Sequence, residues 1–333
     1  MRAPDFWAAR EAGQGALSGL LSGLLAPAGA CYDLAGRLRR AAVTPARAAC
    51  PVICVGNLVA GGAGKTPVVL SLVEHLRRAG GPQPHVLTRG YGGRVAGPLR
   101  VDAARHDAAT VGDEPLLLAQ AAPTWVARDR VAGAHAATAA GARLIVMDDG
   151  FQNPALAKDL SLLVVDGDYG LGNGRVIPAG PLRESPAQGL ERADAVVLLG
   201  EERHGLALRL GAAHRLLRAR LAATAEAQTL RGCRVLPFAG IGRPAKFFAT
   251  LAELGAEVAE TRGFPDHHLY RRSEIEGLLA AAERLAALPV TTAKDAVRLP
   301  PDLRDRITIL RVEVAWQDPA ALTRLLQPFL LSA

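Results

Sequence analysis

One segment of the chain has the sequence Val52-Ile53-Cys54-Val55-Gly56-Asn57-Leu58-Val59-Ala60-Gly61-Gly62-Ala63-Gly64-Lys65-Thr66-Pro67. An apolar run leads into a glycine-rich loop that ends in Gly-Lys-Thr, and the amphipathic run Val68–Leu76 follows. This order of strand, loop and helix is typical of a phosphate-binding loop, in which backbone N–H groups and the helix N-terminus face phosphate oxygens. We therefore predict that residues 59–66 bind the phosphates of a nucleotide.

The last two residues of this loop have separate predicted roles. The ammonium group of Lys65 is expected to reach the β- and γ-phosphates, and the hydroxyl group of Thr66 is expected to ligate Mg²⁺. The general pattern has a glycine five positions before Gly64, where this chain has Val59. A chance glycine-rich turn is the alternative, but the strand before the loop and the helix after it favour the nucleotide site.

Composition limits the class of protein and of partner. The chain has 333 residues, of which 50% are apolar and 21% charged, so it can bury a sizeable core and is not a disordered chain. Its four cysteines form no Cys-x-x-Cys pair, which argues against a disulfide or zinc framework. The net charge of +7 favours an anionic partner, whereas 4% aromatic residues argue against base stacking on nucleic acid. Phosphates or lipid headgroups are therefore the predicted partners.

The first 48 residues differ from the rest of the chain. An apolar stretch, Ala16–Ala30, is followed by a basic cluster at Arg37, Arg39 and Arg40. Because Pro27 and several glycines interrupt it, the stretch is a poor candidate for a membrane span. It also lacks the features of a secretory signal. Two interpretations stay open at this point, a helix in the lipid headgroup plane and a helix packed on the protein's own surface.

After Pro51, strand-like and helical runs alternate, which predicts an α/β protein with parallel sheets covered by helices. A new β–α sequence begins near residue 234, so we predict an N-terminal segment 1–48, a phosphate-loop domain 49–228 and a second, smaller α/β domain 229–333. The predicted strands are Val52–Val55, His85–Thr88, Leu144–Met147, Leu160–Val165, Ala195–Leu199, Arg234–Phe238 and Ile307–Val314. The predicted helices include Val68–Arg78, Glu114–Ala121, Arg130–Ala140, Leu206–Ala227, Pro244–Leu254 and Arg272–Leu288.

Paired aspartates follow one of the predicted strands. Asp148 and Asp149 come directly after Leu144–Met147 and precede Gly150. Strand carboxyl ends face the ligand in open α/β sheets, so these carboxylates are expected near the phosphate loop. Two adjacent buried carboxylates would repel each other unless a cation such as Mg²⁺ neutralised them. A strand-terminating Asp-Gly turn is the structural alternative.

An acid–base pair is predicted from two distant segments. Asp113 precedes an apolar helix and is either an N-cap or the carboxylate that accepts a proton from an alcohol. His267 lies in Phe264-Pro265-Asp266-His267-His268. Adjacent histidines rarely bind one metal ion together, so assistance to an aspartate is the sharper hypothesis for this loop, and a surface turn is the alternative.

Three further stretches are candidates for ligand contact. Residues 88–94 contain Arg89 and Tyr91 in a glycine-rich turn suited to anion contact. Arg183 and Glu184 follow two prolines. The stretch Thr291–Asp295 resembles the Lys-x-Asp loops with which some phosphate-loop proteins recognise a purine base.

In order along the chain, these motifs resemble the tetraacyldisaccharide 4′-kinases, the lipid A kinases of the Gram-negative inner membrane. The resemblance covers most of the chain, and this family also lacks the first glycine of the loop. The motifs are Val-Gly-Asn-Leu and Gly-Gly-Ala-Gly-Lys-Thr-Pro, Arg-Gly-Tyr-Gly-Gly-Arg, Gly-Asp-Glu-Pro, Ala-Arg-Asp-Arg (127–130), Asp-Asp-Gly-Phe-Gln (148–152), Pro-Ala-Gly-Pro-Leu-Arg-Glu, Phe-Pro-Asp-His-His and Thr-Ala-Lys-Asp-Ala.

The resemblance implies transfer of the ATP γ-phosphate to the 4′-hydroxyl of a tetraacyldisaccharide 1-phosphate, with Mg²⁺. It implies two α/β/α domains around the nucleotide and an N-terminal helix on the cytoplasmic face of the inner membrane, whose surface is anionic. No obligate protein partner is evident. The implied catalytic residues are Lys65, Asp113 and His267. Thr66, Glu114, Asp148 and Asp149 belong to the implied metal region. Arg89, Tyr91, Asn153, Arg183 and Glu184 are the implied substrate or positioning residues.

One position departs from the family. Histidine usually follows Asp-Asp-Gly-Phe-Gln, and this chain has Asn153, which can still donate or accept a hydrogen bond and which we expect to have a positioning role rather than to titrate. Two other classes stay open as alternatives. A nucleotide-dependent GTPase switch would need neither Asp113 as a base nor a lipid-facing helix, and a catalytically silent nucleotide-binding membrane protein would not need Lys65, Thr66 and Asp148.

Overall fold

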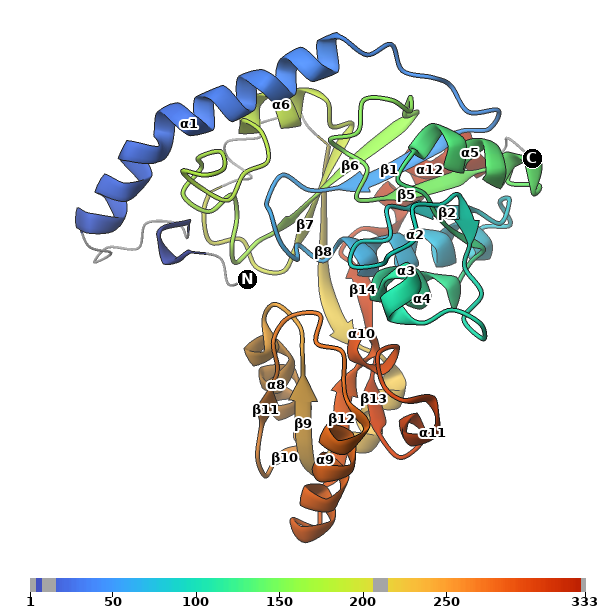
Figure 1. Ribbon diagram of the computed structural model, residues 1–333. Helices are drawn as coiled ribbons and strands as arrows, with labels where there is room; N and C mark the ends of the chain where they lie inside the picture. The colour runs from blue at the N-terminus through green and yellow to red at the C-terminus, as the bar shows by residue number, and fades with distance from the viewer. Residues whose placement is uncertain (1–3, 8–15, 206–214, 331–333) are drawn as a thin grey trace.

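The computed structural model describes residues 4–7, 16–205 and 215–330. Figure 1 shows a larger lobe with the N-terminal helix along it and a smaller lobe below, with strands running between the two. The nucleotide-loop segment lies in the larger lobe and the Phe264–Tyr270 segment in the smaller one. The active-site candidates therefore come from both lobes.

A mixed sheet forms the centre of the larger lobe. Within the described residues its strand order is β14-β8-β7-β6-β1-β5-β2-β4-β3, and all pairs are parallel except β14–β8 and β3–β4. Strand β1 lies between β5 and β6, and Val55 pairs with Asp148. The strands are β1 (Val52–Gly56), β2 (His85–Thr88), β3 (Leu99–Arg100), β4 (Thr124–Val126), β5 (Ile145–Asp148), β6 (Leu160–Asp166), β7 (Ala195–Leu199), β8 (Arg215–Ala223) and β14 (Val312–Trp316).

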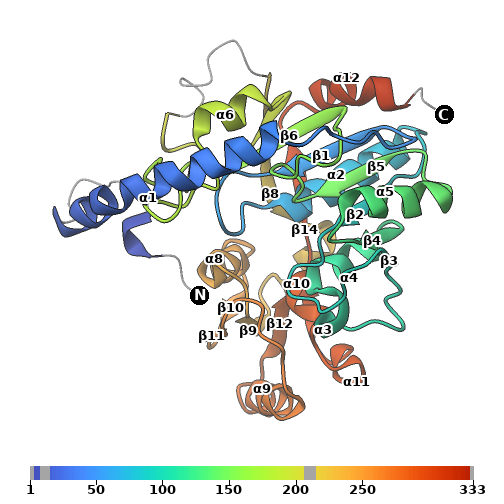
Figure 2. The same ribbon diagram turned by 45° about the horizontal axis from the view of Figure 1, so that its top comes forward.

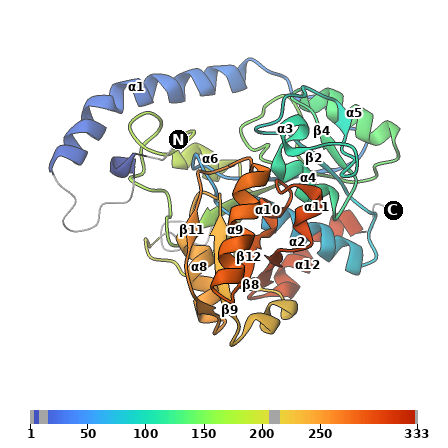
Figure 3. The same ribbon diagram turned by 60° about the horizontal axis from the view of Figure 1, so that its bottom comes forward.

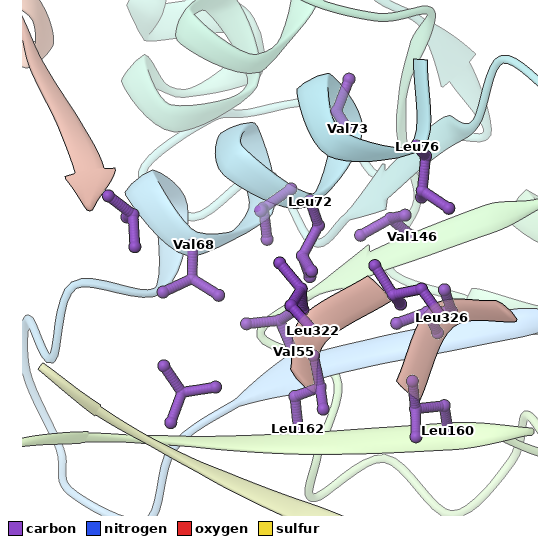
Figure 4. Packing of buried hydrophobic residues seen from close by; sticks show 14 of the residues in the cluster. Val55, Val68, Leu72, Val73, Leu76, Val146, Leu160, Leu162, Leu322 and Leu326 are labelled. Carbon is purple, nitrogen blue, oxygen red and sulfur yellow. The ribbon is translucent and has the colours of Figure 1, made fainter. Parts of the chain in front are cut away.

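Both faces of this sheet are apolar, as the unbroken apolar runs of the central strands predict. Along β1, Ile53 and Val55 face helices α2 (Lys65–Arg78) and α12 (Pro319–Leu330), while Val52 and Cys54 belong to the core on the side of α5 (Arg130–Ala139). Figure 4 shows Leu72 of α2 and Leu322 of α12 meeting Val55. Both leucines are fully buried, and truncation of such a side chain to alanine costs about 2–5 kcal/mol.

The smaller lobe has a sheet of its own. Its strand order is β10-β9-β12-β13, with β11 also paired to β9, and every pair among these described strands is parallel. The strands are β9 (Arg234–Ala239), β10 (Glu257–Val258), β11 (Arg262–Gly263), β12 (Leu288–Thr292) and β13 (Thr308–Leu310). The helices are η3 (Ala225–Leu230), α8 (Pro244–Glu253), α9 (Arg272–Arg284), α10 (Ala293–Ala296) and α11 (Pro301–Arg304). Further helices of the larger lobe include α3 (Ala108–Val111), α4 (Asp113–Ala119) and α6 (Pro186–Glu191).

The connection between the lobes differs from the prediction. The prediction of a helix over Leu206–Ala227 is wrong for the described residues. Residues 215–223 form strand β8, and a 3₁₀ helix follows that strand. Residues 206–214 lie outside the described part of the chain. Leu217 and Ala219 are buried while Arg218 and Arg220 are exposed, which is the period of two of a strand. Pairing with β7 and β14 therefore overrides the helix propensity of alanine, leucine and arginine.

The C-terminal end of the chain returns to the larger lobe. The predicted single strand Ile307–Val314 is two strands, β13 in the small sheet and β14 in the large one, and α12 then packs on the large sheet. Two passages of chain, β8 and β14, thus connect the lobes (Figure 1). The boundary at residue 229 stays our proposal for the start of the smaller domain.

Helix α1 (Ala16–Ala41) is attached to the larger lobe along one side only. The hydroxyl of Ser22 donates to the carbonyl of Ala179 at 2.7 Å, and Asp33 accepts from the amide of Ser185 at 2.9 Å. Leu20, Leu24 and Leu38 are exposed on the same helix. Figures 2 and 3 show α1 projecting past the lobes. Among the described residues, no helix is both long and apolar enough to span a membrane.

Candidate active site

The loop between β1 and α2 is held by its first polar residue. Asn57 is buried, and its amide donates to the carbonyls of Val59 and Gly61 at 2.8 and 3.3 Å. Lys65, the first residue of α2, donates to Oδ1 of Asn57 at 3.2 Å. Gly64 precedes the helix with a φ of 79°, a conformation that strains residues with a side chain. The loop and the helix N-terminus together form the geometry expected for a phosphate site.

The structure explains why valine is tolerated at position 59, where the general motif has glycine. It forms an antiparallel bridge with Leu182, and the amide of the next residue, Ala60, donates to the carbonyl of Pro181 at 2.8 Å. Bridged residues of this kind are extended, so no left-handed conformation is required at this position and valine is accommodated. The segment that carries Arg183 is thereby fixed beside the loop.

Asp148 is an isolated carboxylate at the carboxyl end of β5. It is 1% exposed, and neither of its oxygens has a hydrogen-bond partner among the described residues. Burial and the charges of Glu114 and Asp149 raise its pKa to about 7, against the opposing charge of Lys65. An orphaned buried carboxylate beside a phosphate loop fits a hard cation, which prefers oxygen ligands.

The protein alone does not supply a full metal cage. No group of three or more His, Cys, Asp or Glu side chains in the described residues is arranged to hold a metal ion. Mg²⁺ in nucleotide sites usually takes one or two protein carboxylates and completes its shell with phosphates and water. Asp148 and the hydroxyl of Thr66, in the first turn of α2, fit that smaller requirement.

Asp149 is already engaged by cations. Its Oδ1 lies 2.8 Å from Arg183 and 3.6 Å from Lys65. Burial alone would raise the pKa of Asp149, but the charges of Lys65 and Arg183 outweigh it, so the pKa is lowered. Two cations therefore converge beside the phosphate loop, and the structure brings Lys65, Asp149 and Arg183 together.

Glu184 ties several elements together from a buried position. It accepts from Gln152 at 3.0 Å and from Arg192 at 2.7 Å, and Arg40 of α1 lies 3.4 Å away. Gln152 also donates to the carbonyl of Asn57 at 2.9 Å. The network connects the N-terminal helix to Asn57, the residue that follows β1 and precedes the predicted phosphate loop.

Asn153 stabilises a turn next to this network. Its side-chain oxygen accepts from the amide of Ala155 at 2.9 Å, and its carbonyl accepts from the ammonium group of Lys158 at 2.6 Å. Both contacts stabilise the backbone of the turn that follows, within residues 153–158.

The segments of Asp113 and His267 meet between the lobes. Asp113 opens α4 and is buried, and its Oδ2 lies 2.9 Å from Nδ1 of His267. Lys294 and Arg298 lie 4.0 and 3.6 Å from the same oxygen. Burial alone would raise the pKa of Asp113, but the hydrogen bond from His267 and the charges of Lys294, His267 and Arg298 lower it overall. Asp113 therefore stays ionised near neutral pH.

The two histidines of this loop have different partners. His268 lies 3.0 Å from Glu274 and stacks on Phe264, with 4.9 Å between the ring centroids. His267 instead faces Asp113, and the ring of Tyr91 lies 5.5 Å from its own. Tyr91 is 68% exposed, and Arg89 is exposed as well. Both side chains are available to an incoming ligand.

Lys294 and Asp295 do not form the expected base-reading loop. Lys294 contacts Glu114 at 3.1 Å. Asp295 is fully buried and accepts from the amide of Gly240, the hydroxyl of Tyr270 and the guanidinium of Arg298 at 2.6–2.8 Å. Its carboxylate is a structural acceptor inside the smaller lobe, so the purine-reading hypothesis for this pair is wrong.

Sequence reasoning did not single out Asn57, Gln152 or Arg298. Asn57 directly follows the apolar strand, a position from which a side chain can bond the loop, and this signal was present in the sequence. Arg298 lies four residues after Lys294, but nothing local distinguishes it from the many other arginines.

Comparison with known proteins places the chain among relatives that match over almost its full length. A family model described as tetraacyldisaccharide-1-P 4′-kinase (LpxK) matches residues 21–330. The tetraacyldisaccharide 4′-kinase of Rhodospirillum centenum is 59% identical over 99% of this chain and 97% of its own length. That of Paramagnetospirillum magneticum is 56% identical over 98% of both chains.

A solved structure agrees with the fold. The "apo" form of LpxK from Aquifex aeolicus, crystallised in complex with ATP, matches with a TM-score of 0.74 and 25% identity, over 93% of this chain and 99% of its own. The predicted α/β fold class and the predicted family resemblance are both confirmed. The chain belongs to the tetraacyldisaccharide 4′-kinase family.

Proposed function

We propose that this chain transfers the γ-phosphate of ATP to the 4′-hydroxyl of a tetraacyldisaccharide 1-phosphate, a step of lipid A biosynthesis. The observation that carries the proposal is the contact between the buried carboxylate of Asp113 and the half-buried imidazole of His267, which joins the two lobes at 2.9 Å. A nucleotide switch has no need for such a pair, whereas transfer to an alcohol needs a carboxylate for the acceptor hydroxyl. Family membership supports the same reaction.

Each residue of the candidate site has its own proposed role in this reaction. Lys65 and Arg183 stabilise the negative charge of the transferring phosphoryl group, and Asp113 orients the acceptor hydroxyl. The acceptor oxygen bonds to the γ-phosphorus as the bond from that phosphorus to the leaving ADP oxygen breaks, and the hydroxyl proton passes to Asp113. His267 holds the Asp113 carboxylate in place. Thr66 and Asp148 are the proposed Mg²⁺ ligands, and the ion supplies further neutralisation of phosphate charge when bound.

The reaction is tested with purified protein, Mg²⁺, γ-³²P-labelled ATP and the lipid A disaccharide 1-phosphate. We expect a labelled lipid on thin-layer chromatography, and none when the acceptor is omitted. Tight, GTP-selective nucleotide binding without lipid phosphorylation would contradict the proposal and favour the switch hypothesis.

We also propose that α1 attaches the protein to the cytoplasmic face of the inner membrane. One side of α1 is bound to the larger lobe, while Leu20, Leu24 and Leu38 remain exposed. Arg37 and Arg39, which are exposed near its C-terminal end, suit an anionic headgroup layer. Since the lipid acceptor resides in a membrane and ATP in the cytoplasm, attachment there brings the two substrates together.

The membrane proposal is tested by replacing the three exposed leucines with serine. We expect the triple variant to lose flotation with vesicles that contain anionic phospholipid, as should a variant lacking residues 1–40. The triple variant is the cleaner test, because the deletion also removes Asp33 and Arg40, which contact the larger lobe. Leu269→Ser, at an exposed leucine of the smaller lobe, is the matched control. Unchanged flotation of the triple variant would place the attachment elsewhere.

A further inference from the structure

Arg298 is a buried arginine of the smaller lobe that follows α10. Its side chain is 1% exposed, and its guanidinium is satisfied almost entirely by backbone carbonyls and one carboxylate. Nη1 donates to the carbonyl of His268 at 3.2 Å, and Nη2 donates to the carbonyl of Gly240 at 3.0 Å and to Asp295 at 2.6 Å. The guanidinium also lies over the ring of Tyr270, 5.9 Å from its centroid. A planar fork of donors suits this arrangement, and lysine cannot reproduce it.

The carbonyls that Arg298 binds belong to the support of His267. The amide of His267 donates to the carbonyl of Gly240 at 3.0 Å, so this one oxygen accepts from both His267 and Arg298. The other carbonyl belongs to the residue directly after His267. Arg298 thus binds the carbonyl that accepts from the amide of His267 and also the carbonyl of the next residue, His268.

His267 needs such support because of its backbone conformation. Its φ is 59°, in the left-handed region that residues with a side chain rarely adopt and that persists only where the surroundings enforce it. In this conformation its Nδ1 reaches Asp113 at 2.9 Å while Nε2 lies 3.9 Å from Asp266. A relaxed backbone at this residue would redirect the imidazole away from Asp113.

We propose that Arg298 is a positioning residue for phosphoryl transfer: by binding the carbonyls of Gly240 and His268 it holds His267 in its left-handed conformation against Asp113. The inference rests on the proposed roles of Asp113 and His267 and names the group that fixes their geometry. Arg298 itself comes within 3.6 Å of Asp113, so its charge also faces the carboxylate. The substitution to lysine separates the two contributions, because lysine keeps the charge and loses the fork.

The decisive experiment compares Arg298→Lys, Arg298→Met and Arg306→Met. Arg306 is an exposed arginine of the same lobe that pairs with Glu283, so it serves as the matched control. We expect Arg298→Lys to lower kcat by about 10- to 100-fold with KM for Mg·ATP changed less than about threefold, because a small misplacement of a catalytic group costs this much. Arg306→Met should leave both constants unchanged.

A double-mutant cycle distinguishes positioning of His267 from general loss of structure. In a His267→Ala background, Arg298→Lys should change kcat by less than about threefold, since groups that act as a unit are not additive. An equal loss of kcat in both backgrounds, or full activity of Arg298→Lys, overturns the inference. Circular dichroism establishes whether the lysine variant is folded. If Arg298→Met does not fold, the test rests on Arg298→Lys alone.

A measurement without catalysis completes the design. In the protein labelled with ¹⁵N-histidine, the imidazole signals of His267 should shift in Arg298→Lys and stay in place in Arg306→Met. If the wild type phosphorylates no lipid, the proposed reaction fails, and this spectrum alone decides the positioning role. Identical His267 signals in the wild type and Arg298→Lys overturn it.

Discussion

Two sets of ion pairs join the lobes, and they differ in burial rather than in charge. The inner bridge comprises Asp113 and Glu114 of the larger lobe with His267, Lys294 and Arg298 of the smaller one. The outer bridge comprises Asp166 and Asp168 of the larger lobe with Arg243 and Lys246 of the smaller one. In both, carboxylates of the large-sheet lobe meet cations of the small-sheet lobe.

The environments decide what each bridge can do. In the inner bridge Asp113 and Arg298 are 3% and 1% exposed, and the other members are 25–30% exposed. In the outer bridge the exposed fraction runs from 17% for Asp166 to 51% for Lys246. Charges near the surface are screened by water and salt, and such pairs contribute about 0–1 kcal/mol. Buried charges are screened much less, so removing the partner of Asp113 or Arg298 leaves a charge without compensation. The inner bridge is therefore suited to catalysis, and the outer bridge to a weak, salt-sensitive contact between the lobes.

The strongest test of this contrast removes the carboxylate of the inner bridge. Asp113→Asn should lower turnover by about 100-fold or more, because the acceptor hydroxyl loses the group that orients it and takes its proton. The lipid-phosphorylation assay measures the effect at saturating Mg·ATP. Asp168→Asn in the outer bridge is the matched control and should retain nearly full turnover; comparable losses in both variants would remove the distinction between the bridges.

Substitution of Lys294 should cause the next largest loss of activity. Its ammonium group contacts Glu114 at 3.1 Å and lies 4.0 Å from Asp113. Burial lowers its pKa, but the charges of Glu114 and Asp113 outweigh burial and raise it, so it is a cation at neutral pH. Lys294→Met removes that cation from two carboxylates, and we expect kcat/KM to fall by about 10-fold. Wild-type kcat/KM in Lys294→Met would show that these carboxylates need no cation.

The pH dependence of metal binding also separates buried from exposed carboxylates. The pKa of Asp148, raised by burial to about 7, lies above its ordinary value of 3.8, so protons compete with Mg²⁺ as the pH falls. Apparent Mg²⁺ affinity in the presence of ATP should drop by about 10-fold between pH 8 and pH 6. Titration of activity with Mg²⁺ at both pH values measures it, and equal affinities would contradict a role for Asp148.

The same shift predicts the sign of the stability change without metal. Because the folded state binds the Asp148 proton more tightly than the unfolded chain does, its contribution to stability is largest at low pH and is lost as the pH rises through about 7. Mg·ATP should therefore raise the melting temperature more at pH 8 than at pH 6.

The smallest effect is expected at the outer bridge. Lys246→Ala removes contacts of 3.2 and 3.4 Å to Asp168 and Asp166, while Arg243 still contacts Asp166 at 2.8 Å. We expect kcat to change less than about threefold and the free energy of unfolding by less than about 1 kcal/mol, with the difference from wild type vanishing in high salt. Lys246→Arg should match the wild type. A large change in kcat or in the free energy of unfolding that persists in high salt would show that the outer bridge is more than a weak surface ion pair.

Local motifs predicted the larger lobe better than the connection between the lobes. The strand before the loop, the helix after it and the aspartates ending β5 are defined by neighbours in sequence, and the structure has β1, α2 and β5 there. Residues 215–223 contain helix-forming residues but pair as β8 with β7 and β14, and β14 comes from about 90 residues later in the chain. Propensity carries no information about such distant pairing.

The residues of the candidate site likewise fall into those that local motifs predict and those that only the fold brings together. Lys65, Thr66 and Asp148 could be proposed from the chain because a phosphate loop and a strand end are local patterns with known chemistry. Lys294 and Asp295 were misassigned because adjacency in sequence suggested a shared ligand, while the fold points one at Glu114 and the other into the core of the smaller lobe. Arg298 had no local signal.

The amino-acid order alone was enough to predict the α/β fold class, the family and a candidate phosphate loop, since each is read from motifs of residues that lie within a few positions of one another. Tertiary structure alone revealed that β8 and β14 connect the lobes, that Val59 bridges to Leu182 and that Arg298 supports His267. These features depend on contacts between residues that are from 30 positions apart (Arg298 and His268) to 123 positions apart (Val59 and Leu182), and only the folded chain brings such residues within a few ångströms of each other.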